Sequence, residues 1–597
     1  MDPEGAEVAG WSDAVAARAR DWVADDPDPI TRDELAGLLD GADQGDPAAR
    51  AEIADRVAAA LDFGTAGLRG RLGAGPNRMN LAVVIRTAAG IASWLAATGD
   101  TDAARRGVAI CFDARHRSAD FAEASAAVFA AAGIRAHVLP GPLPTPVLAF
   151  AVRRLGAAAG VMVTASHNPP QDNGYKVYDG TGRQIVAPTD AEIARATAAV
   201  ARVSAVPRTG PEDPDIVRVG DELVAAYVAG AAAVGLVPSA RDVTIAYTAM
   251  PGVGAATFRR VLAAAGFAPA VEVPAQVEPD PDFPTVAFPN PEEPGALDLG
   301  LATASAAGAH VLLANDPDAD RLGVAVPDPT RGPATSPEGW RALRGDEIGA
   351  VLADHLLAHG GVVPGSVLAT TIVSSTLLGR MAESAGVPYE ETLTGFKWIS
   401  RAPGPGRTLA LGYEEALGFC VGDLVGDKDG LSASVIFAEA VAVQRARGRC
   451  VLDVLDDLAR AHGVHLTGQW SVRVAGADGA ARLAAAMAAL RSDPPADLAG
   501  HRVTSITDLV DGDAARGFPP SNVLTLRLDL GAGATARIVV RPSGTEPKLK
   551  CYLEVVEPVP AGAPASPDAD GLPAARGRAA ESLVALTAAV AAVLGPF

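Results

Sequence analysis

The sequence predicts an α/β protein with three consecutive α/β mixed-sheet domains followed by a C-terminal α+β domain. Short apolar runs of strand character alternate with alanine-rich helical segments over most of the chain, the pattern of mostly parallel sheets covered by helices. The last quarter carries several strand-like runs in succession, which indicates antiparallel pairing. The length of 597 residues fits about four domains at ~150 residues each.

The composition limits the class of partner. With 49% hydrophobic and 20% charged residues, the chain is expected to be a folded, soluble protein. A formal net charge of −21 argues against nucleic acid or an anionic membrane as the main partner, although a local basic pocket can still bind a phosphorylated small molecule. Residues 1–4 show no signal peptide, and the apolar run 583–594 is too short for a membrane span of ~20 residues. We therefore expect a packed terminal helix and a cytoplasmic protein.

The cysteines point to a reducing compartment. They lie far apart and form no C-x-x-C pair, so a disulfide framework or a thiolate metal site is not indicated. We expect reduced, mostly buried thiols at Cys111, Cys420, Cys450 and Cys551.

The first 60 residues are helical in character, because Ala, Asp, Glu and Arg dominate there. A glycine-rich stretch, FGTAGLRG at 63–70, follows. Its glycines allow the backbone to approach a ligand closely, and the planar guanidinium of Arg69 could bind an oxyanion. Taken alone, however, a glycine-rich turn with a surface arginine is the better interpretation, since the stretch is neither a dinucleotide nor a Walker loop.

A serine stands at the end of a predicted strand in the first domain. After predicted strands at 108–112 and 136–139, the apolar run 160–163 indicates a buried strand that leads into Thr164-Ala165-Ser166-His167-Asn168-Pro169. Residues 170–174 indicate a loop. An α/β fold usually places its chemistry at such strand ends. The alternative is a plain strand-to-turn exit, because Ser, Asn and Pro are common turn formers.

A lysine follows this serine within the apolar segment 174–178. If Lys176 is desolvated, it could act in proton transfer. A strand lysine that points to solvent is an equally good interpretation.

The second domain ends a strand on a dense acidic loop. Residues 204–215 are rich in Pro, Gly and acidic residues and suggest a boundary, and strands are predicted at 243–247 and 309–314. The latter runs into Asn315-Asp316-Pro317-Asp318-Ala319-Asp320-Arg321, whose three carboxylates would repel one another without a cation. An EF-hand is excluded, because its glycine position holds Arg321 and its glutamate position holds Pro327. A magnesium site is favoured over a solvated acidic turn.

The third domain follows a Pro/Gly/Ser-rich linker at 327–340. We expect a helix from Asp346, strands at 366–373 and 408–411, and a polar loop that contains Glu414 and Glu415. Two adjacent carboxylates could bind sugar hydroxyls or hold a proton. An acidic helix N-terminus is the alternative.

The C-terminal domain is expected to have strands at 471–475, 523–529, 536–540 and 549–555, before a final helix. The third of these leads into Arg541-Pro542-Ser543-Gly544-Thr545-Glu546-Pro547-Lys548. An arginine, two hydroxyls, a glycine and free backbone amides in one turn suit a phosphate anchor.

Four of these stretches resemble the signature loops of one family, and in that family's order. TASHNP, the Asp-x-Asp-x-Asp-Arg loop, GYEEALG at 412–418 and RPSGTEP at 541–547 are similar to those of the α-D-phosphohexomutase superfamily, the phosphoglucomutases and phosphomannomutases. The resemblance spans about residues 60–555. FGTAGLRG, TGFKW at 394–398 and GYEEALG are most similar to the phosphoglucomutase/phosphopentomutase branch.

The resemblance implies four domains around a central cleft, which we place at 1–212, 213–327, 328–455 and 456–597. It implies that Ser166 is carried as a phosphoserine and that Mg²⁺ is held by the serine phosphate with Asp316, Asp318 and Asp320. The other catalytic residues expected are Arg69, His167, Lys176 and Lys397. The substrate-binding residues expected are Arg321, Glu414, Glu415, Arg541, Ser543, Gly544, Thr545 and Lys548.

Two positions depart from the family pattern. Ala416 stands where many relatives have a serine, which puts one sugar hydroxyl contact in question, and Pro251 stands where this branch would have a histidine. The implied reaction interconverts a sugar 1-phosphate and 6-phosphate in two phosphoryl transfers, with a hexose 1,6-bisphosphate as intermediate and activator. Glucose, mannose and pentose phosphates remain open as substrates, and the chain is expected to be a monomer or homodimer.

Two other functions could use some of the same residues. A serine hydrolase would use Ser166 with His167, but the chain has no Gly-x-Ser-x-Gly elbow, and adjacent residues are not expected to share a nucleophile–base hydrogen bond. A sugar-phosphate-binding protein without catalysis is expected to have lost the serine or an aspartate, and all four are present.

Overall fold

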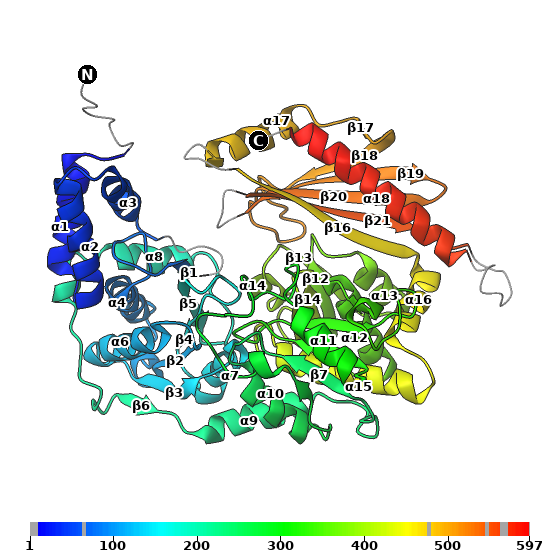
Figure 1. Cartoon of the computed structure of the whole chain (residues 1–597), viewed down its shortest axis with the longest axis horizontal. Coiled ribbons are helices and arrows are strands. Elements are labelled where there is room, and N and C mark those ends of the chain that lie inside the picture. The colour runs from blue at the N-terminus through cyan, green and yellow to red at the C-terminus, as the bar shows by residue number, and fades with distance from the viewer. Residues whose placement is uncertain (1–9, 62–66, 475–478, 544–547, 561–570, 596–597) are drawn as a thin grey trace.

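The computed structural model describes residues 10–61, 67–474, 479–543, 548–560 and 571–595. Figure 1 shows three α/β units in succession and a fourth unit in which two helices, α17 and α18, lie over an antiparallel sheet. The predicted fold class is confirmed. The domain boundaries within the chain stay a prediction, and one strand beyond residue 212, β6, extends the sheet of the first unit.

A small helical unit precedes the first sheet, as the composition predicted. It consists of α1 (Asp13–Asp25), α2 (Pro29–Asp43) and α3 (Pro47–Ala58). Each helix begins at a residue whose side chain accepts a backbone N–H of the first turn, namely Ser12, Asp28 and Asp46. The three helices share their own apolar core, in which Leu35 and Ile53 are fully buried.

The first sheet has the strand order β1-β5-β4-β2-β3-β6. The pairings among β4, β2, β3 and β6 are parallel, whereas β5 pairs antiparallel with both β4 and β1. All residues of β4 are buried, which is typical of a strand covered by helices on both faces. The elements are β1 (Leu68–Arg71), α4 (Leu81–Ala97), α5 (Ala103–Arg106), β2 (Val108–Phe112), α6 (Ser118–Ala131), β3 (Ala136–Pro142), α7 (Thr145–Leu155), β4 (Ala159–Val163), β5 (Asp172–Asp179), α8 (Thr189–Ala198), η1 (Val203–Ala205) and β6 (Ile216–Arg218).

The second sheet has the order β11-β10-β9-β7-β8, with parallel pairs at β7 and antiparallel pairs at β10. Its elements are α9 (Asp221–Ala232), β7 (Ile245–Thr248), α10 (Gly254–Ala264), β8 (Val271–Glu272), η2 (Pro274–Gln276), α11 (Asp298–Ala306), β9 (Val311–Ala314), β10 (Gly323–Pro327), η3 (Pro337–Gly339) and β11 (Trp340–Ala342).

The third sheet has the order β13-β12-β14-β15, and only the last pair is antiparallel. Its elements are α12 (Gly345–Ala358), β12 (Ser366–Thr371), α13 (Leu377–Ala385), β13 (Tyr389–Thr392), α14 (Phe396–Ile399), β14 (Thr408–Glu414), β15 (Gly418–Val421), α15 (Gly430–Ala446) and α16 (Val451–His462). One apolar core continues through all three α/β units.

The fourth unit has a sheet of order β16-β21-β20-β19-β18-β17, in which every pairing is antiparallel. Its separate apolar core is formed by residues of this sheet and of its helices. Its elements are β16 (Val464–Arg473), α17 (Gly479–Ser492), β17 (Asp497–Leu498), β18 (His501–Asp508), β19 (Leu524–Gly531), β20 (Ala534–Pro542), β21 (Lys548–Glu557) and α18 (Leu572–Leu594). A small apolar cluster joins this sheet to the third unit, where Ile372 and Val373 meet Val539 and Tyr552.

The terminal helix is longer than the apolar run that the sequence suggested. α18 has 23 residues and is, within the described part of the chain, the one helix long and apolar enough to cross a membrane. It packs on β16 and β21, and Leu572, Leu586 and Val590 are buried there. The expectation of a packed terminal helix is confirmed, but the expectation that this segment is too short to span a membrane was wrong.

Several local expectations differ from the structure. Residues 172–174, predicted as loop, begin β5, because they pair with β1. Ile372 and Val373, predicted as the end of a strand, lie in a turn. Glu414 ends β14 and Glu415 begins the turn to the antiparallel strand β15, so the pair does not lie at a helix N-terminus. The cysteines are free, and all but Cys450 are buried.

Candidate functional site

Two strand ends from different units meet at the site. β4 leads into Ser166, and β9 leads into the aspartate loop 315–321, so each loop leaves the carboxyl end of its strand. Ser166 Oγ lies 3.1 Å from Asp316 Oδ2, although 150 residues separate the two in the sequence. Thr145 strengthens this contact between the units, because its backbone N–H and its hydroxyl both donate to Asp318.

A buried arginine holds the serine turn in shape. Arg115 Nη2 donates to the carbonyl oxygen of Ser166 at 2.6 Å, and Nη1 donates to that of Pro169 at 2.8 Å. Asp113 fixes the arginine from behind, with 3.3 Å between Oδ2 and Arg115 Nε, and accepts the hydroxyl of Thr164 at 2.6 Å. The turn needs this support because Ser166 has φ = 55°, a left-handed conformation that is uncommon outside glycine.

The neighbouring histidine also reaches the serine. His167 Nδ1 lies 3.1 Å from Ser166 Oγ, so the expectation that adjacent residues would not share a hydrogen bond was wrong. The left-handed backbone at Ser166 turns the two side chains toward each other. Burial, and then the cations Arg321 and Arg69, lower the pKa of His167 well below its ordinary value. The imidazole is therefore neutral and can accept a proton.

The aspartates form a buried carboxylate cluster. Asp316, Asp318 and Asp320 each have a carboxylate oxygen that lies within 4.8 Å of an oxygen of the other two. All three side chains are fully buried. Burial and the two neighbouring carboxylates raise the pKa of Asp316 well above its ordinary range. Burial acts in the same sense on Asp320, but Lys176 and Lys428 lower its pKa strongly.

Two lysines neutralise part of this charge. Lys176 Nζ lies 2.7 Å from Asp318 Oδ2 and 3.1 Å from Asp320 Oδ2, and its side chain is buried. The interpretation of Lys176 as a desolvated residue at the site is therefore the better one. Lys428, just before α15, lies 3.2 Å from Asp320 Oδ2.

The cluster fits a hard divalent cation. Asp318 Oδ1 and Asp320 Oδ1 are buried and, among the described residues, have no hydrogen-bond partner. Buried carboxylate oxygens without partners are costly unless a ligand occupies them. An oxygen-only donor set of this kind suits Mg²⁺.

Two arginines border the cluster. Arg321 Nη1 pairs with Glu292 at 3.0 Å, and Nε lies 3.9 Å from Asp316 Oδ2. Arg69, on β1, has a buried Nε without a partner among the described residues. Burial lowers the pKa of Arg69, while the charges of Asp318 and Asp320 act to raise it. Residues 63–66 of the FGTAGLRG stretch lie outside the described residues.

The two glutamates lie next to the aspartate loop. A bridge joins Arg321 to Gly418, and Leu322 N–H donates to the carbonyl of Leu417 at 3.0 Å. Burial raises the pKa of Glu414, although the charges of Lys428 and Arg321 act to lower it. Burial and the charges of Glu414, Asp346 and Glu292 raise the pKa of Glu415 to about 8.

A cavity of about 310 Å³ opens beside Glu415. Its lining comes from the second, third and fourth units, including Glu292, Asp346, Glu415, Thr467 and Tyr552. Its volume is at the lower end of that of small-molecule sites.

The described part of the expected phosphate anchor lies at the end of β20 and the start of β21 in the fourth unit. Arg541 ends β20 opposite Lys550 of β21, and Ser543 N–H donates to the carbonyl of Lys548 at 2.7 Å. Burial lowers the pKa of Lys550, and Glu415 is the largest charge that acts against this shift. Tyr552, on the same strand as Lys550, lines the cavity beside Glu415. Gly544 and Thr545 lie outside the described residues.

The structure does not bring Lys397 into contact with the aspartates. Its side chain is buried on α14, with Nζ 5.9 Å from the ring of Trp398. Burial lowers its pKa, and the charges that act on it are those of Asp190 and Arg401.

Sequence reasoning missed three cations of the site. Arg115 follows the end of the strand predicted at 108–112, and neither it nor Lys428 nor Lys550 was predicted as a site residue. Lys428 stands in Gly426-Asp427-Lys428-Asp429-Gly430, and such a run of charges between a strand and a long apolar helix is a signal that could have found it. Lys550 carries no such signal, since lysines at alternate positions of a strand usually point to solvent.

Comparisons with known proteins agree with this geometry. Four family models match in order: the phosphoglucomutase/phosphomannomutase α/β/α domains I, II and III at residues 60–203, 225–331 and 344–461, and the family's C-terminal domain at 528–561.

Curated relatives carry several substrate names. A "probable phosphomannomutase" of Haemophilus influenzae is 41% identical over 80% of this chain and 93% of its own. A "probable phosphoribomutase" of Schizosaccharomyces pombe is 35% identical over 89% and 92%. A phosphoglucomutase of Staphylococcus epidermidis is 32% identical over 83% and 90%.

Among solved structures, a putative phosphomannomutase from Thermus thermophilus superposes with a TM-score of 0.62 at 25% identity, over 88% of this chain and 99% of that one. The matched domains account for more than half of the chain and keep the family's order. The chain therefore belongs to the α-D-phosphohexomutase superfamily, the phosphoglucomutases and phosphomannomutases, and is a phosphomutase of the isomerase class.

Proposed function

We propose that this chain interconverts the 1-phosphate and 6-phosphate of a hexose, with glucose as the first candidate and mannose as the second, through a phosphoserine at Ser166. The observation that carries the proposal is the 3.1 Å contact between Ser166 Oγ and Asp316, which joins a strand-end nucleophile to a buried carboxylate cluster. A phosphoryl-transfer site needs such a carrier beside a metal that can balance its charge.

Two transfers complete the reaction. In the first, the Oγ–P bond of phosphoserine 166 breaks, a bond forms between phosphorus and the free hydroxyl oxygen of the sugar monophosphate, the hydroxyl proton passes to a base of the site, and Ser166 Oγ takes up a proton. The bisphosphate then reverses its orientation. In the second, the bond between the other phosphorus and its sugar oxygen breaks, that oxygen takes up a proton from the site, and Ser166 Oγ forms a bond to the phosphorus and gives up its proton. We assign this proton to His167, whose neutral ring lies 3.1 Å away.

The residues that would hold Mg²⁺ are Asp316, Asp318 and Asp320 together with the serine phosphate, in agreement with the partnerless oxygens of Asp318 and Asp320. When bound, the metal supplies positive charge at the phosphoryl oxygens. Lys176, which is buried beside these aspartates, would add positive charge there, and Arg69 would add a second positive charge to the transferred phosphoryl group.

The sugar and the second phosphate have separate proposed contacts. Glu414 and Glu415, with Arg321 beside them, would bind sugar hydroxyls, and Ala416 supplies no hydroxyl of its own. Arg541, Ser543, Gly544, Thr545 and Lys548 would hold the phosphate that is not transferred, and Lys550 adds charge there. A hexose 1,6-bisphosphate is the proposed activator that restores the phosphate to Ser166. Lys397 stays a predicted catalytic residue, although it makes no contact with the aspartates.

A pentose phosphate is the alternative substrate, because curated relatives named phosphoribomutase and phosphopentomutase align over most of the chain. A catalytically inactive sugar-phosphate-binding protein is the other alternative. A cytoplasmic location and a monomeric or homodimeric state are further predictions.

The test uses purified full-length protein primed with glucose 1,6-bisphosphate. Steady-state rates on glucose 1-phosphate, mannose 1-phosphate and ribose 1-phosphate are measured in parallel, and peptide 161–176 is analysed by mass spectrometry for phosphoserine. We expect the highest kcat/KM on glucose 1-phosphate and phosphate on Ser166. Preference for ribose 1-phosphate would favour the pentose alternative. Turnover without phosphate ever appearing on Ser166 would contradict the carrier role.

A further inference from the structure

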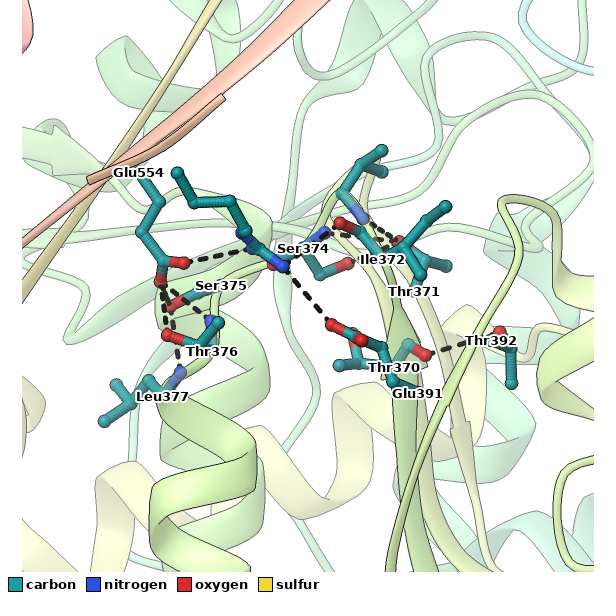
Figure 2. Close-up of polar contacts among 12 residues, drawn as sticks. Thr370, Thr371, Ile372, Ser374, Ser375, Thr376, Leu377, Glu391, Thr392 and Glu554 are labelled. Carbon is teal, nitrogen blue, oxygen red and sulfur yellow. Dashed lines mark hydrogen bonds and ion pairs between the residues drawn. The ribbon is translucent and has the colours of Figure 1, made fainter. Parts of the chain in front are cut away.

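Two charged residues of the fourth unit reach into the third unit. Arg537 of β20 and Glu554 of β21 lie 3.0 Å apart as an ion pair and are 5% and 2% exposed. Both contact one short segment, residues 371–376, which we call the 371–376 turn and which links the end of β12 to the start of α13. Figure 2 shows this segment, with Glu554 on one side of Ser375 and Thr376 and with Glu391 below Ser374.

Glu554 holds the end of the turn at the N-terminus of α13. One carboxylate oxygen accepts the Ser375 hydroxyl at 2.7 Å, the Thr376 N–H at 2.7 Å and the Thr376 hydroxyl at 3.1 Å. His465 Nδ1 lies 3.1 Å from the same oxygen. A carboxylate is favoured at this place because the N–H groups of a first helical turn have no partner within the helix.

Arg537 holds the middle of the turn by its backbone. Nη1 donates to the carbonyl of Ile372 at 3.1 Å, Nη2 donates to the carbonyl of Ser374, and Nη1 also reaches Glu391 at 3.2 Å. A planar guanidinium spreads five N–H donors over three nitrogens and so reaches acceptors on two of its sides, whereas an ammonium has three donors on a single atom.

The opposite side of the 371–376 turn contacts the loop that contains Glu414 and Glu415. Glu415 N–H donates to Ser374 Oγ at 3.3 Å, and that hydroxyl lies 3.3 Å from Glu415 Oε2. Thr371 Oγ1 is 2.9 Å from Ser374 Oγ, which leaves the hydroxyl few other positions. Ser374 therefore touches Arg537 through its carbonyl and Glu415 through its side chain.

The ion pair is built to persist over the working pH range. Burial acts to raise the pKa of Glu554, but Arg537 and His465 lower it to about 2. Arg537 stays protonated, since its pKa is raised by Glu554 and Glu391 against the effect of burial. Removing one member would leave the other charged and buried, so the contact is held strongly once formed.

We propose that Arg537 is a positioning residue for Glu415: by binding the carbonyl of Ser374 it sets the place of the hydroxyl that holds the Glu415 backbone and carboxylate. This inference rests on the proposed function. The loop that contains Glu414 and Glu415 is then in position only when the sheet that carries Arg541 is docked on the third unit. One contact thus links the proposed sugar contact and the proposed phosphate anchor, which belong to different units.

A double-mutant cycle tests the proposal on the full-length protein. Arg537→Met and Glu415→Gln are made singly and together, and kcat and KM are measured with the best phospho-sugar substrate. If Arg537 acts through Glu415, Arg537→Met lowers kcat/KM about 10-fold alone and less than about 2-fold further in the Glu415→Gln background. Losses that multiply fully would overturn the proposal, because they would show independent action.

Arg241→Met is the matched control. Arg241 also donates to backbone carbonyls and pairs with a buried glutamate, Glu439 at 2.8 Å, but it lies between the second and third units, away from Glu415. We expect it to lower the melting temperature as Arg537→Met does, with kcat/KM of the folded protein within about 2-fold of the wild type. An equal loss of kcat/KM in Arg241→Met and Arg537→Met would mean that Arg537 has only a structural role.

Ser374→Ala keeps the proposal testable if Arg537→Met does not fold. This variant keeps the carbonyl that Arg537 binds and removes only the hydroxyl that Glu415 contacts. It should lower kcat/KM and increase deuterium exchange in the peptide around Glu415. A folded Ser374→Ala protein with unchanged exchange and kinetics would refute the positioning of Glu415 through Ser374. Absence of mutase turnover in the wild-type protein would instead refute the proposed function, and deuterium exchange around Glu415 would still test the positioning.

Discussion

At the scale of single residues, the site depends on a serine that the backbone holds in a left-handed conformation. Arg115 and Asp113 maintain this conformation, which directs the hydroxyl of Ser166 toward Asp316 and brings His167 beside it. The sequence predicted the serine and the aspartates as a site but could not predict the His167 contact, because it depends on one backbone angle.

The partnerless oxygen of Asp318 leads to the first prediction. Asp318→Asn should abolish most of the Mg²⁺-induced rise in melting temperature, because an amide offers the metal a neutral ligand, and should lower kcat by about 100-fold or more. Calorimetry with and without Mg²⁺ and steady-state kinetics check this. Asp423→Asn, which changes a surface partner of Arg153, is the control and should leave both quantities unchanged.

The raised pKa of Glu415 leads to the second prediction. In the folded protein it is raised to about 8 from an ordinary value of 4.5, so the folded state holds this proton more tightly than the unfolded state. The stability that this group contributes is complete below about pH 4.5 and is lost as the pH rises toward 8. Lys550 is the cation that faces it, and Glu414, Asp346 and Glu292 are the facing acids.

Glu415→Gln should therefore flatten the fall in stability between pH 5 and pH 8, since glutamine has no proton to lose. Denaturant unfolding of both proteins across this range measures the difference. Parallel curves for wild type and variant would show that Glu415 is already ionised at pH 5.

At the scale of elements, the sequence predicted the buried strands better than the exposed ones. β2, β4 and β9 are continuous apolar runs because helices cover both faces of their sheets. β18 is exposed along most of its length and carries no apolar alternation, so nothing in its residues distinguished it from a loop. The Ser374–Glu415 contact and the reach of Arg537 could not be predicted, because they depend on how separate units dock.

The start of α15 is packed against the aspartate loop, which gives the third prediction. A Cβ at Gly430 would lie 2.2 Å from the carbonyl oxygen of Arg321, so Gly430→Ala must displace the loop. We expect a loss of roughly 1–3 kcal/mol in the free energy of unfolding and weaker Mg²⁺ stabilisation. Chemical denaturation with and without Mg²⁺ measures both.

Gly37→Ala is the matched control, since Gly37 lies in helix α2 with open space around its Cβ position. It should be neutral or stabilising by up to about 1 kcal/mol. A Gly430→Ala protein as stable as wild type would mean that α15 and the loop separate more easily than the packing indicates.

At the scale of the whole molecule, three units share one continuous core while the fourth has its own. The proposed reaction requires both ends of the sugar to visit Ser166, so one anchor on the fourth unit must hold the distal phosphate in both orientations. Arg541→Ala should reduce kcat/KM for the 1-phosphate and the 6-phosphate to similar extents, by about 10- to 150-fold. Initial rates in both directions measure this, and a loss confined to one direction would contradict a shared anchor.

The distribution of thiols gives the molecule a natural attachment point for a fluorescent dye. Cys450 begins α16 and is the only exposed cysteine of the four, all of which lie among the described residues. It stands at the junction with the fourth unit, where Asp456 of α16 pairs with Arg576 of α18. Because burial raises its pKa, labelling needs mildly alkaline conditions. A single maleimide dye on the unaltered chain would then report, in real time, whether the fourth unit moves during each turnover.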